Sequence, residues 1–235
     1  MEPAKHDIRF DEPLYTVAEA ARFLGVPPST FSTWAKGYER RPAGRPAVRG
    51  EAVVSSMRAA RNLPSIPFIG LAEGLVLAAF RRAGVSLQQI RLAAAVLERE
   101  IGFEHALASK SLYTDGAVIL YDFAEHGDTR LSGLTEVVSR QQVFAPVVED
   151  YLKRIEYGHD GWASMVASPV TRRPVVVADP KRAFGSPIFL HGAAPVESVV
   201  SRIRAGDPPA SVAKDFGVPL RDVDEYLGAT RLVAA

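Results

Sequence analysis

A group of small polar and basic side chains between residues 29 and 49 has the chemistry to contact nucleic acid. Serine and threonine hydroxyls and the lysine amine can hydrogen-bond to base edges and phosphates, and arginine guanidinium groups pair with phosphates. The candidate DNA-binding residues are Ser29, Thr30, Ser32, Thr33, Lys36, Arg40, Arg41, Arg45 and Arg49. The first five would share one helix and the arginines would follow it. This order is typical of a helix set in a DNA major groove with a basic segment beside it.

Two short helices around a tight turn are predicted to position these side chains. Thr16 is a residue type that caps helix N-termini, and Gly25 stands where a helix C-cap needs a left-handed residue. Pro28 fits the first turn of a second helix, because its missing N–H costs little there. Phe31 and Trp34 would anchor that helix to a core and leave its polar face outward. Two packed helices with a glycine turn also occur in proteins that bind no nucleic acid, so that alternative stays open.

The charge around this segment favours nucleic-acid binding. Residues 36–61 carry seven basic and two acidic side chains, a net charge of +5, whereas the whole chain carries only +1. A basic block on a nearly neutral protein is the pattern expected for phosphate contacts. The run from Arg45 to Arg49 could form a wing whose arginines reach the DNA backbone or the minor groove.

Other classes of functional site are poorly represented. The chain has no cysteine, which excludes disulfides and thiolate metal sites and fits a reducing cytoplasm. Its five histidines form no HExxH or i, i+4 pair, and no glycine-rich phosphate loop is present. We therefore expect no enzyme, no cofactor and no metal site, although a metal site assembled in three dimensions stays open. The first residues contain no signal-peptide pattern, and the most apolar stretch, residues 66–80, is too short to span a bilayer, so we expect a cytoplasmic protein without membrane contact.

Two stretches of the chain resemble known families. Residues 15–38, with the basic segment after them, look like the winged helix-turn-helix of MerR-type regulators. Residues 174–227 are similar to a small helical domain of bacterial antitoxins, which has a short strand, an Arg-x-x-Gly-x-Pro step, another strand and a proline-led helix. The matching positions in this chain are Arg182, Gly185, Pro187, Pro195, Gly206, Ala213, Phe216, Gly217 and Val223. Together the two stretches resemble mycobacterial VapB-type antitoxins with a MerR-like head.

This resemblance implies an antitoxin of a type II toxin–antitoxin pair. Such a protein would be a homodimer that binds operator DNA, autoregulates its operon and neutralises a PIN-domain ribonuclease toxin. These toxins carry an acidic metal site that an inserted arginine could block, and Arg231 in the C-terminal tail is a candidate; the other interpretation is a solubilising surface arginine. A second hypothesis is a one-component regulator that senses a small molecule. Its apolar pocket would lie around Tyr121, Phe123, Trp162 and Phe189.

The two ends of the chain share a sequence pattern. AARFLGVP, residues 20–27, parallels VAKDFGVP, residues 212–219, and each predicts a helix, a glycine turn and a second helix. Residues 207–235 carry five acidic and three basic side chains, a net charge of −2. Because acidic side chains repel phosphates, we expect the C-terminal unit to bind a protein, form a dimer or simply pack, but not to read DNA.

The expected fold is mainly α, of the α+β class. We expect a MerR-like DNA-binding domain with following helices in residues 1–110, a connecting strand and helix region in residues 111–168, and an antitoxin-like domain in residues 169–235. The last would combine a small antiparallel sheet with a helix-turn-helix-like bundle.

Apolar periodicity and turn residues predict the elements of the middle and the C-terminal part. In the helix predicted at 67–82, Gly70 and Gly74 would permit a close helix crossing. Helices are predicted at 67–82, 87–100, 103–109, 144–157, 195–204, 208–216 and 219–227. Strands are predicted at 117–123, 162–167, 175–178 and 188–190.

Overall fold

The structure of the protein is a computed structural model that describes residues 6–41, 47–88, 90–91, 94, 105–110 and 148–234. In chain order, the N-terminal part contains α1 (Ile8–Asp11), α2 (Val17–Leu24), α3 (Pro28–Lys36), β1 (Tyr38–Arg40), β2 (Val48–Gly50), α4 (Phe68–Arg82) and the 3₁₀ turn η1 (Ala106–Ala108). The C-terminal part contains β3 (Ile155–Tyr157), β4 (Ala163–Ala167), β5 (Val176–Ala178), the 3₁₀ turn η4 (Ala183–Gly185), β6 (Ile188–Phe189), α8 (Val196–Arg204), α9 (Pro209–Asp215) and α10 (Leu220–Ala234).

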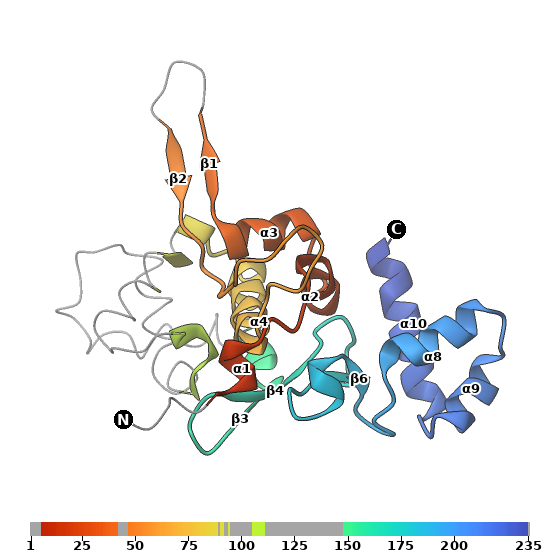
Figure 1. Cartoon of the computed structure of the whole chain (residues 1–235). Coiled ribbons are helices and arrows are strands. Elements are labelled where there is room, and N and C mark those ends of the chain that lie inside the picture. Colours follow the sequence, from red (N-terminus) through yellow and green to blue (C-terminus); the bar gives the residue numbers. More distant parts are fainter. Residues whose placement is uncertain are drawn as a thin grey trace, which may run out of the picture.

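Helix α4 is the centre of the N-terminal core, and every residue from Phe68 to Phe80 is buried. Figure 1 shows α2 and α3 packed beside it. A Cβ on Gly74 would lie 2.7 Å from the ring of Phe31 and 2.8 Å from Leu24, and one on Gly70 would lie 2.3 Å from the Ser55 carbonyl oxygen. The predicted close helix crossing is therefore confirmed at Gly74, which lies against α2 and α3, whereas Gly70 makes room for the carbonyl group of a loop residue.

A four-stranded antiparallel sheet in the order β3-β4-β5-β6 lies below this core in Figure 1. Strand β4 pairs with β5 through Val166 and Ala178, and β5 pairs with β6 through Val177 and Ile188. The sheet therefore runs across residue 168, where the sequence suggested a domain boundary. Helices α8, α9 and α10 form a bundle beside the sheet (Figure 1).

The predicted helix at 144–157 is wrong at its C-terminal end. Residues 148–152 are helical, but the chain then turns and enters strand β3. The Arg154 guanidinium donates hydrogen bonds to the carbonyl oxygens of Ser168 and Thr171, at 2.7 and 3.0 Å, and Ile155 pairs with Val166 of β4. Pairing with the sheet edge thus overrides the helical spacing of the apolar residues.

The other predicted elements agree with the structure to different degrees. Strands β4, β5 and β6 and helices α4, α8 and α9 match their predicted ranges within one or two residues. Helix α10 runs to Ala234, beyond its predicted end at 227, and the helix predicted at 103–109 is the 3₁₀ turn η1 in its described part. The strand predicted at 117–123 and most of the helix predicted at 87–100 lie outside the described residues. The mixed α/β fold with a helix-turn-helix is confirmed.

Hydrogen bonds and an aromatic contact are among the interactions that join the N-terminal core to the sheet and its loops. The Tyr15 hydroxyl donates to the Gly185 carbonyl oxygen at 2.8 Å, and the Ser168 hydroxyl donates to the Phe23 carbonyl oxygen at 2.6 Å. The Phe10 ring meets Trp162 edge to face, with 5.6 Å between ring centroids. None of the helices within the described ranges is long and apolar enough to cross a lipid bilayer.

Candidate nucleic-acid interface

The turn between α2 and α3 is fixed by local hydrogen bonds. The Thr16 hydroxyl accepts from the Glu19 amide at 3.2 Å and the Glu19 carboxylate accepts from the Thr16 amide at 2.8 Å, which makes a capping box. Gly25 ends α2 in the left-handed region at φ 65°, and the Val26 amide donates to the Ala21 carbonyl oxygen at 3.0 Å. The predicted cap residues Thr16 and Gly25 are confirmed.

Helix α3 presents two different faces. Phe31 and Trp34 are buried, with 6.0 Å between their ring centroids, so the helix is held firmly against the core. Pro28 occupies its first turn, as predicted. The predicted contact residues take the remaining positions: Ser29 and Lys36 are exposed, and Thr30, Ser32 and Thr33 are half-buried.

The antiparallel hairpin β1–β2 follows α3 directly and projects past it as a wing (Figure 1). On this wing the Glu39 carboxylate pairs with Arg41 at 2.7 Å and with Arg49 at 3.0 Å. Both arginine side chains stay largely exposed, at 77% and 73%. The backbone of Arg40 belongs to β1, whereas its side chain and the whole of Arg45 lie outside the described residues.

Backbone contacts join the wing and α3 into one unit. The Trp34 carbonyl oxygen accepts from the amides of Val53 and Val54 at 2.8 and 3.1 Å, and the Ser56 hydroxyl donates to the Ala35 carbonyl oxygen at 2.7 Å. The segment that follows β2 is therefore hydrogen-bonded to the C-terminal part of α3.

Two supporting groups were not predicted from the sequence. Arg91 lies 5.0 Å from the Tyr38 ring centroid on the wing and donates to the Glu51 carbonyl oxygen at 2.7 Å. Buried Glu73 of α4 accepts from the Ser55 amide at 2.6 Å and lies 3.0 Å from His105 Nδ1. These contacts join positions far apart in the sequence, so no local pattern signals them.

The helix pair, its buried anchors and the wing define a winged helix-turn-helix. A family described as "Putative DNA-binding HTH domain" matches residues 13–94. Over most of its length the chain is also similar to a Mycobacterium tuberculosis protein named "Putative antitoxin VapB45", with 43% identity over 233 residues that cover 95% of this chain and 97% of that protein. The crystal structure of Rv2018 from the same organism is similar with a TM-score of 0.73 and 37% identity, and covers 93% of this chain and 99% of that one. The chain therefore belongs to the VapB45 antitoxin family, which confirms the resemblance drawn from its sequence.

Two acidic residues of the C-terminal helix pair α9–α10 form ion pairs within the protein. Asp222 is fully buried, where it lies 2.9 Å from His191 Nδ1 and 3.2 Å from the Arg173 guanidinium. Glu225 accepts from Arg173 Nε at 2.6 Å. The carboxylates of Asp222 and Glu225 are therefore engaged in intramolecular ion pairs. Arg231 lies in α10, but its side chain is outside the described residues.

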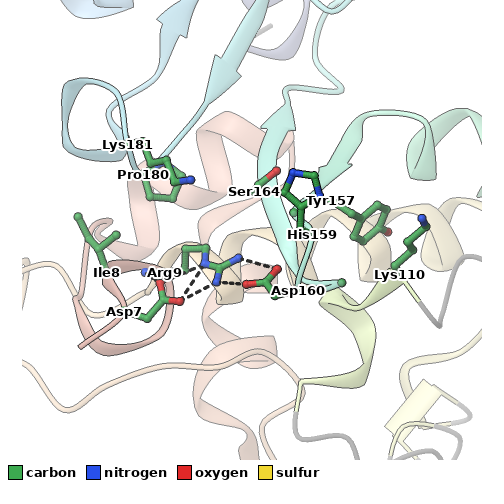
Figure 2. A pocket seen from close by; sticks show the side chains of 12 residues that line it. Asp7, Ile8, Arg9, Lys110, Tyr157, His159, Asp160, Ser164, Pro180 and Lys181 are labelled. Carbon is green, nitrogen blue, oxygen red and sulfur yellow. Dashed lines mark hydrogen bonds and ion pairs between the residues drawn. The ribbon is translucent and has the colours of Figure 1, made fainter. Parts of the chain in front are cut away.

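A cleft of about 790 Å³ lies between α1, the β3–β4 turn and the segment after β5. Figure 2 shows Arg9 in this cleft between Asp7 and Asp160, and its guanidinium is hydrogen-bonded to both carboxylates. Hydrogen bonds from Arg9 lower the pKa of Asp7 and the pKa of Asp160, and they raise the pKa of Arg9. The arginine therefore acts as a clamp between α1 and the sheet.

Proposed function

We propose that this protein is an antitoxin that binds operator DNA through α3 and the β1–β2 wing, and that it represses its own operon. One observation carries the proposal: α3 is anchored by two buried aromatic side chains, so its polar face is held outward beside exposed arginines of the wing. Ser29, Thr30, Ser32, Thr33 and Lys36 would face the major groove. Arg40, Arg41, Arg45 and Arg49 would contact phosphates or the minor groove.

The ion pairs of Glu39 give this interface a testable electrostatic feature. In the free protein Glu39 forms ion pairs with Arg41 and Arg49, whose side chains remain exposed to solvent. Phosphates would compete with Glu39 for both guanidinium groups, and the carboxylate would then lie close to the DNA backbone. Glu39→Gln should therefore tighten DNA binding severalfold, because it removes the competing charge.

We infer that the partner of the C-terminal half is a PIN-domain ribonuclease toxin. The name of the 43% identical relative supports an antitoxin role. The C-terminal helix pair has the helix-turn-helix outline, and residues 207–235 carry a net charge of −2, which suits a protein partner better than DNA. Arg231 stays a candidate for insertion into the acidic site of the toxin.

We propose further that the protein acts as a homodimer. Operators read by a winged helix-turn-helix usually consist of two symmetric half-sites, which call for a two-fold symmetric protein. Light scattering of the protein, free and on DNA, should give the mass of a dimer. A monomer in both states would contradict this.

The alternative of a small-molecule sensor is not favoured. Trp162 packs against Phe10 and His105, whereas Phe189 meets Tyr226 edge to face at 5.9 Å. These two aromatic residues therefore belong to different contacts. Tyr121 and Phe123 lie outside the described residues.

Two experiments test the proposal. The first measures the affinity of the protein for the DNA upstream of its own gene. Replacing Arg40, Arg41 and Arg45 together by alanine should weaken binding by at least about tenfold at physiological salt, and unchanged affinity would contradict the DNA-reading role. The second determines whether a ribonuclease-like reading frame adjoins the gene and co-expresses its product with this protein; the absence of such a neighbour, or toxicity that persists, would contradict the antitoxin role.

A further inference from the structure

One aromatic side chain stands out on the surface because nothing described in the protein covers it. Phe184 is 84% exposed, the highest value among the large hydrophobic residues that the structure describes. A phenylalanine normally buries most of its 150–250 Å² of surface, so such exposure is costly in water. Single exposed hydrophobic residues are common, so exposure alone does not mark Phe184 as part of a binding site.

The backbone around Phe184 has an unusual conformation. Ala183, Phe184 and Gly185 all have positive φ, at 47°, 51° and 77°. For residues other than glycine the left-handed conformation costs roughly 1–2 kcal/mol each, and two non-glycine residues adopt it here in succession. The turn thus holds a large apolar side chain outward in a conformation that the sequence alone disfavours.

Neighbouring groups keep the turn in this conformation. The buried Tyr15 hydroxyl donates to the Gly185 carbonyl oxygen at 2.8 Å, and a Cβ on Gly185 would lie 2.8 Å from Leu14. On the other side, the Asp179 carboxylate accepts from the Lys181 amide and the Asp179 carbonyl oxygen accepts from the Arg182 amide, both at 2.9 Å. The base of the turn is therefore rigid while its tip is exposed. Rigid aromatic residues are the usual anchors of protein interfaces, because little entropy is lost when they dock.

The charges beside Phe184 indicate what kind of surface it fits. Lys181 is exposed and Arg182 is half-buried, three and two residues before the phenylalanine. A partner would need an apolar pocket for the ring with carboxylates at its rim. A nucleic acid could pair its phosphates with the two cations and stack a base on the ring, whereas the antitoxin role proposed from the name of the 43% identical relative calls for a protein partner, so a protein is favoured.

We propose that Phe184 is the anchor by which this antitoxin binds its toxin: the ring enters an apolar pocket of the toxin, and Lys181 and Arg182 pair with carboxylates beside it. This inference rests on the proposed function and adds the contact surface to it. It also locates the main contact on the β5–β6 connection, outside the α9–α10 helix pair.

The test measures binding of the purified full-length protein to the proposed toxin, produced from a ribonuclease-like reading frame that adjoins its gene. Phe184→Asn removes the ring, and asparagine tolerates the left-handed conformation, so the melting temperature should not fall. We expect its affinity for the toxin to drop at least about 30-fold. Phe184→Tyr keeps a ring and should bind within a few fold of the original protein. Leu63→Asn is the matched control, because Leu63 is 56% exposed on another loop, and it should bind normally.

The remaining outcomes separate this inference from the proposed function. If the unchanged protein binds the toxin and Phe184→Asn binds equally well, the anchor is refuted while the antitoxin role stands. If the unchanged protein does not bind the toxin at all, both are refuted. If Phe184→Asn splits a dimer into monomers and leaves toxin binding intact, the ring belongs to a contact between two copies and the assignment to the toxin is wrong.

Discussion

The α2–α3 pair and the α9–α10 pair have the same local geometry and different surroundings. Gly25 and Gly217 both adopt a left-handed conformation, at φ 65° and 64°. In both turns the residue after the glycine donates its amide hydrogen to the carbonyl oxygen five residues earlier, at 3.0 and 2.9 Å. When the two glycines are aligned, buried Phe31 corresponds to buried Val223. The repeated sequence pattern is thus a genuine repeat of structure.

The exposed positions of the second helix differ between the two pairs. Ser32 of α3 corresponds to Asp224 of α10, and both face solvent at least in part. Thr30 corresponds to Asp222, which is buried and ion-paired with Arg173. A helix-turn-helix outline is therefore only a scaffold. The side chains on the outer face of the second helix, and the wing beside it, decide whether it suits phosphates.

The largest expected effect comes from the buried anchors. Phe31→Ala should destabilise the protein by about 3–5 kcal/mol and abolish DNA binding, because α3 loses its support. Val223→Ala, at the corresponding position, should cost about 1–3 kcal/mol and leave the DNA affinity of the folded protein unchanged. Urea unfolding and DNA titration measure the two quantities. A matching loss of DNA affinity in Val223→Ala would show that both helix pairs read DNA.

An exchange of charge at the outer face is the second test. Ser32→Asp gives α3 the residue found at the same place in α10, and like-charge repulsion with phosphates should weaken DNA binding at least about tenfold without unfolding the protein. The reverse change, Asp224→Ser, should leave DNA affinity unchanged. Gel-shift titrations at fixed salt measure both. The assignment of α3 to the groove would be wrong if Ser32→Asp bound DNA normally.

The third test compares two helical glycines. Gly74 of α4 packs closely against the α2–α3 pair, whereas Gly228 of α10 has open space around it. A Cβ at residue 74 would meet Phe31 and Leu24 at less than 3 Å, so Gly74→Ala should destabilise by about 1–3 kcal/mol. Gly228→Ala meets nothing within 4 Å and should stabilise by up to about 1 kcal/mol. Thermal unfolding should therefore shift in opposite directions for the two variants. Equal shifts would contradict the packing argument.

The Arg9 clamp should give the smallest effect. The pKa values of Asp7 and Asp160 are lowered by hydrogen bonds from Arg9, so both carboxylates stay ionised in the folded protein at pH values where the unfolded chain has bound protons. Their contribution to stability is complete above about pH 5 and is lost as the pH falls below about 4.

Arg9→Ala should therefore lower the melting temperature by roughly 1–4 °C near neutral pH, and the difference should shrink in acid. Arg172→Ala, at an exposed arginine, controls for the lost charge. A difference between Arg9→Ala and the unchanged protein that is the same at pH 7 and pH 3 would refute the clamp.

Sequence reasoning located the features that depend on neighbours in the chain. The cap at Thr16, the left-handed Gly25 and the anchors Phe31 and Trp34 follow from residue preferences within about one helical turn. The ion pairs of Glu39, the Arg9 clamp and the burial of Asp222 depend on contacts between distant segments. The residues of β3 carry a helical spacing, so only the edge of the neighbouring strand explains their conformation.

The salt dependence of DNA binding tests the central difference between the two helix pairs most directly. Arg41→Ala together with Arg49→Ala removes two exposed guanidinium groups from the wing, and Arg204→Ala together with Arg221→Ala removes two from the C-terminal bundle. We expect the slope of log affinity against log salt to fall by about 0.9 per lost phosphate contact, roughly 1.8 in total, for the wing variant alone. An unchanged slope in the wing variant, or an equal fall in the C-terminal variant, would contradict the account.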